Sequence, residues 1–220
     1  PETITEVFFH ETNTALKEVH FLSETPIDID VSALKNAKLV VPADAYMSYL
    51  RVWGEKLGSN ELCKDDGTEA EYVVENFGIY STDKKILSRL LSSAEGTYCV
   101  SDSVEKLEDD MMQEARYLER IVLGKSVTVL KSDCLAGENL SDIVFTSKAA
   151  PKIEADTFGS SENLENLQIR VPEGSKETYL KAWSSVMDAD ILDLIIQEDT
   201  VKVVENNGWK YVVENDGAVL

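Results

Sequence analysis

Apolar residues recur along this chain with a fixed spacing, in which one residue is followed by others three and five positions later. The pattern occurs five times in the 220 residues. Its members are Leu16, Val19, Phe21; Leu34, Ala37, Leu39; Leu118, Ile121, Leu123; Leu140, Ile143, Phe145; and Leu164, Leu167, Ile169. The last two apolar positions of each set lie two apart, so they point to the same side of a β-strand. Each set therefore predicts a strand with one buried face.

A second apolar motif precedes each of the three later sets and repeats with a constant shift. Its members are Val104, Leu107, Met112; Val127, Leu130, Leu135; and Ala150, Ile153, Phe158. The step between successive copies falls within the range of roughly 20 to 29 residues that is typical of leucine-rich repeats. In that architecture a strand and a return segment bury their apolar face against neighbouring coils. We therefore predict stacked coils from residue 1 to about 42 and from about 99 to 172.

A longer repeat relates two distant segments of equal length, 39–53 and 169–183. In both, a Val-Pro pair is followed by Tyr and Trp, as Tyr49 and Trp53 in the first copy and Tyr179 and Trp183 in the second. Residues four apart share one face of a helix, so helices are predicted near 43–57 and 173–187. We interpret the Tyr and Trp rings as packing residues that cover the open end of a coil stack, with sugar stacking as the alternative.

Two further segments carry the signals of β-hairpins. A polar linker is predicted near 58–70, followed by a hairpin near 71–98 in which Ser81-Thr82-Asp83 forms the turn. The sequence Asn206-Asn207-Gly208 is a strong turn signal between 201–204 and 211–213. Residues 72–78 and 211–217 also resemble each other, which indicates that a further hairpin begins near the end of the chain.

These residues resemble the BspA-like family of bacterial cell-surface leucine-rich-repeat proteins. The family's repeat is similar to 103–123, 126–145 and 150–169, and the end of its repeat runs is similar to Val171-Pro172-Glu173-Gly174-Ser175 with the Tyr and Trp that follow. The family's hairpin is similar to 76–87. Met111-Met112 and Cys134-Leu135 replace the family's usual Ala-Phe pair. The resemblance implies a right-handed α/β solenoid, display on the cell surface or secretion, and binding or adhesion rather than catalysis.

The predicted fold is therefore an α/β, strand-rich leucine-rich-repeat solenoid with two short repeat runs, helical caps and a β-hairpin between the runs. The expected organisation has four parts. A repeat run ending in a helix cap occupies 1–57, a linker and β-hairpin 58–98, a second capped run 99–187, and strands with the start of another hairpin 188–220.

Composition excludes several classes of partner. The chain has 21 Lys and Arg residues against 41 Asp and Glu, a formal net charge of -20, which repels phosphate backbones and anionic lipids. Nucleic acid is therefore not an expected partner. The longest apolar runs are broken by charges, so no membrane insertion is expected in this segment. The acidic residues are interpreted as solvated faces, with calcium sites as the alternative, and Asp65-Asp66-Gly67 as a turn.

Neither a metal site nor a catalytic centre is predicted, and no cofactor is expected. Cys63, Cys99 and Cys134 lack metal-ligand spacing and give no disulfide framework. The histidines, His10 and His20, both lie near the first coil, which disfavours a Cys-His nucleophile pair. The segment Gly124-Lys125-Ser126 resembles the end of a phosphate-binding loop, but Glu119 stands where the first glycine is required.

A binding surface is expected on the side of the strands opposite the core, the concave face of the predicted solenoid. Its candidate residues are Arg120, Val122, Asp142, Val144, Asn166, Gln168 and Arg170. Side chains held on a rigid sheet lose little entropy when they contact a partner. The alternative is that these residues form only the solvated side of a sheet, with Val122 and Val144 packing as cross-strand neighbours.

These observations lead to two hypotheses for function. The first is a non-catalytic binding or adhesion module of a larger bacterial surface or secreted protein, with an extracellular or host protein, or a glycan, as ligand. The second is a structural spacer that holds another domain away from the cell wall. Binding predicts a ligand whose affinity depends on the concave face, whereas a spacer predicts none. The ligand and the oligomeric state are not predicted by the sequence.

Overall fold

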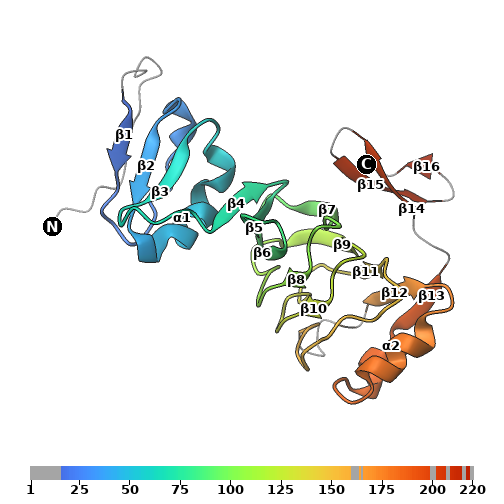
Figure 1. Ribbon diagram of the computed structural model, residues 1–220. Helices are drawn as coiled ribbons and strands as arrows, with labels where there is room; N and C mark the ends of the chain where they lie inside the picture. Colours follow the sequence, from blue (N-terminus) through green and yellow to red (C-terminus); the bar gives the residue numbers. More distant parts are fainter. Residues whose placement is uncertain are drawn as a thin grey trace. The chain divides into compact units, whose positions relative to one another are not determined.

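The computed structural model describes residues 16–159, 164 and 166–198, and the backbone of the strands between 202 and 218 (Figure 1). The chain divides into two compact units, Pro1–Thr82 and Asp83–Leu220. Among the described residues, strands are more numerous than α-helices, and most of the pairings between strands are parallel. His10 lies outside the described residues.

The first unit contains a parallel sheet in the order β1-β2-β3. Its strands are β1 (Glu18–His20), β2 (Lys38–Val41) and β3 (Glu61–Lys64). The helix α1 (Tyr46–Trp53) connects β2 to β3 and is flanked by 3-10 helices at Ala43–Ala45 and Gly54–Lys56; another 3-10 helix, Val31–Ala33, precedes β2. The helix predicted near 43–57 is confirmed. The linker predicted near 58–70 contains β3, which the apolar pattern did not reveal.

A two-stranded hairpin follows within the first unit. Strands β4 (Tyr72–Glu75) and β5 (Gly78–Ser81) are antiparallel, and the turn between them lies at Asn76 and Phe77, both with positive φ. The hairpin predicted from residue 71 onward is thus confirmed at its start. The turn predicted at Ser81-Thr82-Asp83 is also present, since Thr82 and Asp83 form a turn directly after β5, and the turn at 76–77 is an additional one. Asn tolerates this left-handed conformation better than Phe does.

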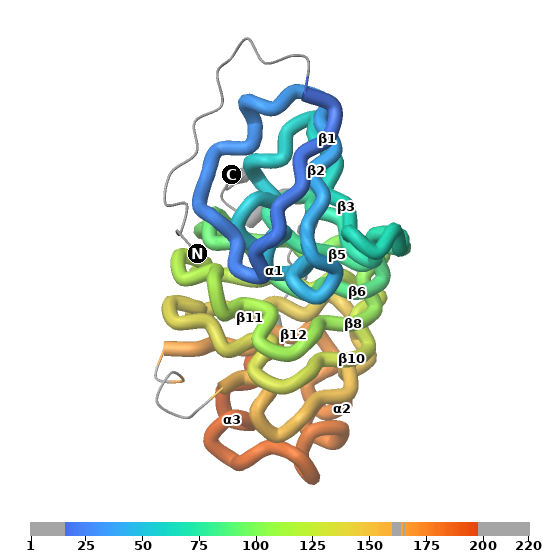
Figure 2. Tube along the Cα trace, turned by 90° about the vertical axis from the view of Figure 1, so that its left-hand side faces the viewer, coloured from blue at the N-terminus to red at the C-terminus, as the bar shows by residue number. Residues whose placement is uncertain are grey.

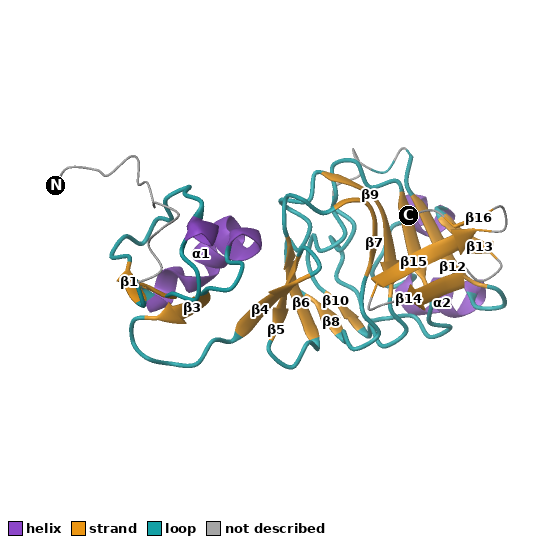
Figure 3. Ribbon diagram, turned by 90° about the horizontal axis from the view of Figure 1, so that it is seen from above, coloured by secondary structure: helices purple, strands orange, loops and turns teal. Residues whose placement is uncertain are grey.

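In the second unit a five-stranded parallel sheet runs in the order β13-β12-β11-β9-β7 (Figure 1), and four of its strands, β7, β9, β12 and β13, are also labelled in Figure 3. The strands are β7 (Glu95–Cys99), β9 (Tyr117–Leu123), β11 (Asp142–Phe145), β12 (Gln168–Pro172) and β13 (Ile195–Glu198). The helices α2 (Lys176–Trp183) and α3 (Ala189–Asp193) connect β12 to β13. The helix predicted near 173–187 is confirmed over a shorter span. Strand β7 joins this parallel sheet, so the hairpin predicted near 71–98 does not extend to it.

The return segments of the second unit carry short parallel strands of their own, visible side by side in Figure 2. These are β6 (Ile86–Leu90), β8 (Lys106–Leu107) and β10 (Val129–Leu130), in the order β10-β8-β6. An isolated bridge joins Val129 to Lys152 in the return segment that follows. The core includes Val104, Leu107, Met112, Leu118, Ile121, Val127, Leu130, Ile143 and Phe158, all buried. The positions predicted to be apolar and internal are thus largely buried.

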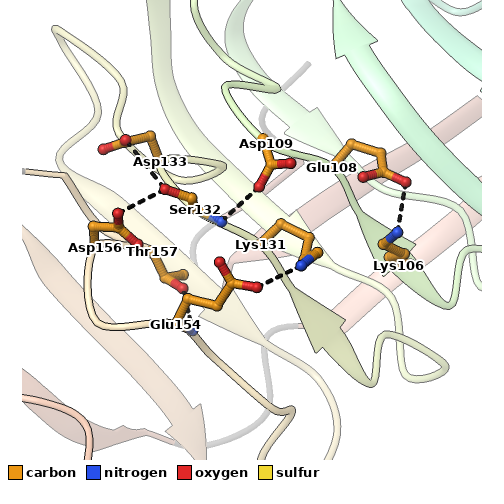
Figure 4. Close-up of polar contacts among 9 residues, drawn as sticks. All are labelled: Lys106, Glu108, Asp109, Lys131, Ser132, Asp133, Glu154, Asp156 and Thr157. Atoms are coloured by element: carbon orange, nitrogen blue, oxygen red, sulfur yellow. Dashed lines mark hydrogen bonds and ion pairs between the residues drawn. The ribbon is translucent and has the colours of Figure 1, made fainter.

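Polar contacts also link successive return segments (Figure 4). The Lys131 ammonium lies 2.5 Å from Glu154, and this hydrogen bond raises the pKa of Lys131. The Ser132 hydroxyl donates to Asp156 at 2.7 Å, and the Ser132 backbone N–H donates to Asp109 at 3.1 Å. Each contact joins residues 23 or 24 positions apart. Because these groups are partly exposed, the contacts align the turns more than they stabilise the fold.

Near the C-terminus, β14 (Lys202–Asn206), β15 (Trp209–Glu214) and β16 (Gly217–Ala218) form an antiparallel sheet. In the pairing of β14 with β15, Asn206 lies opposite Trp209. The hairpin predicted from the Asn-Asn-Gly signal is therefore confirmed in its backbone. The residues between the two strands, 207 and 208, lie outside the described part.

The prediction of a leucine-rich-repeat solenoid is wrong. Such a fold requires each coil to add one strand, at a constant shift, to a continuous sheet. The described strands instead fall into several short sheets, some parallel and some antiparallel. The shift between paired strands also varies, because Val19 pairs with Leu39, Ile121 with Ile143, and Ile143 with Ile169. The apolar spacing specified individual strands but not one uniform repeat.

Candidate functional site

The candidate site lies on one face of the sheet formed by β9, β11 and β12. Two rows of residues cross this face according to the strand register. The first row is Thr97, Arg120, Asp142 and Gln168, and the second is Cys99, Val122, Val144 and Arg170. Six of the seven predicted binding residues are thus brought together. Asn166 is exposed in the turn before β12 and lies outside the strand.

The position of Asn166 corrects the predicted alignment of the last repeat. The apolar spacing placed Asn166 beside Asp142, but the observed partner of Asp142 is Gln168, two positions further along. Arg170 consequently pairs with Val144 and lies diagonally from Asp142. A shift of two keeps the same residues on the same face, since strand side chains alternate with a period of two. It nevertheless changes which residue of β11 lies beside each residue of β12.

Two guanidinium groups hold the carboxylate of Asp142. Arg120 Nε donates to Asp142 Oδ2 at 2.6 Å, and Arg170 Nε donates to Asp142 Oδ1 at 2.7 Å. The Asp142 side chain is 9% exposed, whereas those of Arg120 and Arg170 are 24% and 22% exposed. The carboxylate is therefore enclosed, while both arginine side chains are partly exposed. We call Arg120, Asp142 and Arg170 the arginine clamp.

The remaining residues of this face differ in what they offer a ligand. Gln168 accepts a hydrogen bond from Arg170 Nη2 at 2.8 Å, which fixes the orientation of both side chains. Val122 and Val144 are 2% and 3% exposed and pack with Cys99. Neither valine presents contact area to a ligand in this structure. The polar row and Arg170 therefore carry whatever recognition this face provides.

A depression of about 950 Å³ lies beside the arginine clamp, near the amino ends of the strands. It is lined by Glu95, Gly96, Thr97, Tyr117, Glu119, Asn139 and Ser141. The apolar spacing did not point to these residues, because it marks only the core side of each strand. The available signal was Tyr117, an aromatic residue directly before a predicted core leucine.

The Tyr and Trp rings are packing residues, as predicted, but their helices do not cover the end of a sheet, because β3 follows α1 and β13 follows α2 in the same sheets. In the first unit, Tyr49 donates its hydroxyl to the Ser23 carbonyl and Trp53 its indole N–H to the Ile27 carbonyl. The second unit repeats the arrangement. Tyr179 donates to Ser147 at 2.7 Å, and Trp183 donates to Pro151 at 3.0 Å. All four rings are buried, so none of them is a platform for a sugar.

The described residues offer little that resembles a nucleophilic or metal centre. Burial raises the pKa of Cys134 and of Cys63, which keeps both thiols protonated at neutral pH. His20 is exposed and hydrogen-bonds to Glu18 on the same strand. Within the part of the chain that the structure describes, no three His, Cys, Asp or Glu residues are grouped to hold a metal ion. No helix of the described residues has the length and apolar character needed to cross a membrane.

Comparison with known proteins gives no match in sequence and a likeness to a solved structure. The sequence matches no family model and no curated protein. A structural likeness was found to the crystal structure of the pneumococcal vaccine antigen PcpA, with 11% sequence identity and a TM-score of 0.28. The aligned region covers 84% of this chain and 56% of that one. At this TM-score the likeness does not determine the fold or the function.

Proposed function

We propose that this chain is a non-catalytic binding module of a bacterial surface or secreted protein, and that its protein or glycan ligand contacts the sheet face around the arginine clamp. The observation that carries the proposal is the clamp itself. Two arginines with partly exposed side chains, on β9 and β12, are held by one enclosed carboxylate on the strand between them. Arginine held in this way is common at recognition sites for planar acidic groups.

The rigidity of this face supports binding. The parallel ladder fixes the backbone beneath Arg120, Asp142 and Gln168, and the ion pairs fix the side chains above it. A ligand therefore meets groups whose conformational entropy has already been lost, which lowers the cost of association. The same groups on a loop would have to be ordered when the ligand binds.

Charge also distinguishes this face from the rest of the molecule. The formal net charge of the chain is -20, yet the clamp combines two positive groups with one negative group. A local positive site on an acidic protein selects a partner by electrostatic complementarity. The clamp therefore favours a carboxylate group displayed by a protein or glycan, whereas the charge of the whole chain disfavours extended polyanions.

The non-catalytic part of the proposal is supported by the thiols and the exposed histidine. Cys134 and Cys63 have raised pKa values, the opposite of what an activated nucleophile requires. His20 lies on β1 in the first unit, where its hydrogen-bond partner is Glu18 rather than a thiol or hydroxyl. Neither arrangement resembles a nucleophile paired with a base.

The test is a binding screen in which both guanidinium groups are replaced by uncharged amides that can still donate hydrogen bonds. The purified chain is screened against immobilised extracellular-matrix proteins and a glycan array, beside the double variant Arg120→Gln with Arg170→Gln. A matched control removes two exposed positive charges elsewhere, Lys125→Gln with Lys148→Gln. Circular dichroism verifies that each variant is folded.

The proposal expects a ligand that binds the wild type and the lysine control equally. Its affinity for the arginine variant should fall at least about tenfold, the size of effect expected from losing charged hydrogen bonds. Identical negative profiles for wild type and arginine variant would contradict it and favour the spacer hypothesis. The buried Val122 and Val144 favour that alternative, because they leave this face little apolar contact area. A ligand bound equally by all three proteins would place recognition elsewhere.

A further inference from the structure

The depression beside the arginine clamp has a rigid floor. The Asn139 side-chain amide donates to the Arg116 carbonyl at 2.6 Å, which fixes the peptide directly before Tyr117. Ser141 donates both its backbone N–H and its hydroxyl to the Glu119 carbonyl, at 2.9 and 3.2 Å. Tyr117 and Glu119, the two residues of β9 that line the depression, therefore lie on a fixed backbone.

A sheet irregularity lies where β7 lines the depression, on the side opposite Asn139 and Ser141. The pairing of β7 with β9 shifts by one residue between Gly96 and Thr97, which is a β-bulge. Gly96 has a φ of +59°, and a Cβ added there would meet no atom within 4 Å. Bulges redirect side chains and often lie beside binding sites. Here the extra residue is Glu119 on β9, because Gly96 pairs with Leu118 and Thr97 with Arg120. The bulge therefore places Glu119 in the depression, opposite the open space at Gly96.

Tyr117 supplies the apolar part of this depression. Its side chain is 69% exposed, the highest value among the large aromatic side chains of the described residues. The rings of Tyr49, Trp53, Tyr179 and Trp183, by contrast, are buried. Exposing an aromatic ring to water on a rigid strand costs free energy, and ligand binding recovers that cost when the ring is covered.

We propose that this depression binds one ring of a neutral saccharide, with Tyr117 as the stacking platform. A sugar ring has one face of C–H groups, which packs on an aromatic ring, and a rim of hydroxyl groups. The rest of the lining matches that rim, because Glu95 and Glu119 accept hydrogen bonds and Thr97 both donates and accepts them. The Ser141 hydroxyl donates its proton to the Glu119 carbonyl and can still accept a hydrogen bond. No aliphatic side chain lines the depression among the described residues, so a purely apolar ligand gains little there.

The charges near Tyr117 determine which saccharides fit. Glu95 and Glu119 repel anionic sugars at close range, which leaves the neutral ones. A basic peptide would satisfy the two carboxylates and the ring, but Arg120 follows Glu119 directly and lies opposite Thr97 in the register. The excess positive charge of the clamp therefore reduces the attraction of these two carboxylates for a cationic ligand. This site shares Thr97 with the proposed ligand face but none of the three clamp residues, so either site can fail without the other.

The experiment is saturation-transfer difference NMR on the whole chain with four probes. Two are neutral oligosaccharides, cellotetraose and tetra-N-acetylchitotetraose; one is the anionic trisaccharide 3′-sialyllactose; and one is tetralysine. The variants are Tyr117→Ala, which removes the ring, and Tyr117→Phe, which keeps it. Phe77→Ala is the control, because it removes another exposed aromatic ring, at the β4–β5 turn. Because Tyr117 is largely exposed, its variants should fold as the wild type does, and circular dichroism checks this.

The expected result is saturation transfer to at least one neutral oligosaccharide. Transfer should persist in Tyr117→Phe and Phe77→Ala, and affinity should fall about tenfold or more in Tyr117→Ala, as the loss of an aromatic contact implies. Absence of transfer to both neutral probes at millimolar concentration would overturn the proposal. So would equal transfer in wild type and Tyr117→Ala, or a preference for tetralysine or the sialylated probe. The clamp variant Arg120→Gln with Arg170→Gln should keep the saccharide signal.

Discussion

A single carboxylate, that of Asp142, is bonded to guanidinium groups from the two neighbouring strands. Removing one member of an enclosed ion pair leaves charge without its partner and strongly destabilises proteins. Because the two arginine side chains are partly exposed, water recovers part of that loss here. Asp142 therefore has a structural role whether or not a ligand binds above it.

At this position we expect Asp142→Ala to lower the free energy of unfolding by about 2 kcal/mol, below the range for a fully buried pair. Urea denaturation followed by circular dichroism measures the change. Lys125→Ala is the control, since Lys125 and Asp102 lie 3.9 Å apart with side chains 72% and 48% exposed. It should change stability by less than about 0.5 kcal/mol. Equal stabilities for the two variants would show that the clamp contributes nothing.

The hydroxyl of Tyr179 gives a second prediction at this scale. It donates to the Ser147 carbonyl within a buried cluster, so Tyr179→Phe leaves that carbonyl with fewer partners. We expect a loss of about 1 kcal/mol, the typical value for one hydrogen bond. Tyr117→Phe should leave thermal stability unchanged, because that side chain is largely exposed. Equal melting temperatures for wild type and Tyr179→Phe would contradict this.

The burial of Cys134 predicts that its thiol reacts with alkylating reagents only when the chain is unfolded. Burial raises the pKa of this thiol above its ordinary value of 9.0, so the folded protein keeps it protonated where the unfolded chain ionises. Its contribution to stability is therefore complete below about pH 9 and declines as the pH rises further. At pH 8, iodoacetamide should modify Cys134 only after urea unfolding, as measured by peptide mass spectrometry. Labelling of the folded chain at the unfolded rate would contradict the burial.

At the scale of strands and helices, the sequence predicted which segments form strands better than it predicted which residues pair between them. Ile121 and Ile143 occupy equivalent positions of the apolar pattern, and they pair as expected. Ile143 was expected to pair with Leu167 but pairs with Ile169. Leu164 and Leu167 are buried as well, so every alignment of this segment that differs by two buries apolar residues. Periodicity alone cannot choose between such alignments.

Two elements of the second unit lacked a sufficient apolar signal. Strand β7 reads Glu95-Gly96-Thr97-Tyr98-Cys99, in which Gly96 stands where the alternation requires an apolar residue. The helix α3, Ala189–Asp193, is too short to establish a helical period. Arg120 and Asp142 could be placed side by side from the sequence, whereas the depression around Tyr117 required the position of β7.

Close packing between successive turns predicts the effect of one glycine substitution. Gly159 has a φ of +80°, and a Cβ added there would lie 2.7 Å from the Cβ of Ala136, which belongs to an earlier turn. Gly159→Ala combines backbone strain with overpacking, so we expect a loss of about 2 to 3 kcal/mol in urea unfolding. Gly174→Ala isolates the backbone cost, because Gly174 has a similar φ and open space around it. It should cost about 1 kcal/mol. Equal effects would indicate that the turns do not pack closely.

For the whole molecule, acidic residues outnumber basic ones by 41 to 21, and this excess should determine how thermal stability responds to salt. Repulsion among like charges destabilises the compact state, and it weakens as the Debye length falls. We expect the melting temperature to rise by a few degrees between 10 and 200 mM NaCl, as measured by scanning calorimetry. A fall over the same range would mean that attractive pairs, such as Lys131 with Glu154, outweigh the net repulsion.

The hydrogen bonds of Trp53 and Trp183 determine where this chain can be shortened without losing contacts between a helix and the segment before it. Trp53 reaches back 26 residues to Ile27, and Trp183 reaches back 32 residues to Pro151. Each helix thus closes a loop of its own unit and supplies a hydrogen-bond donor to a carbonyl group of an earlier segment, which in the case of Pro151 is buried. A fragment that ends at residue 172 keeps β12 but exposes Phe145 and Phe158, whose rings lie against Trp183. Shortened or fused versions of this protein should therefore keep α1 with 23–27 and α2 with 147–151.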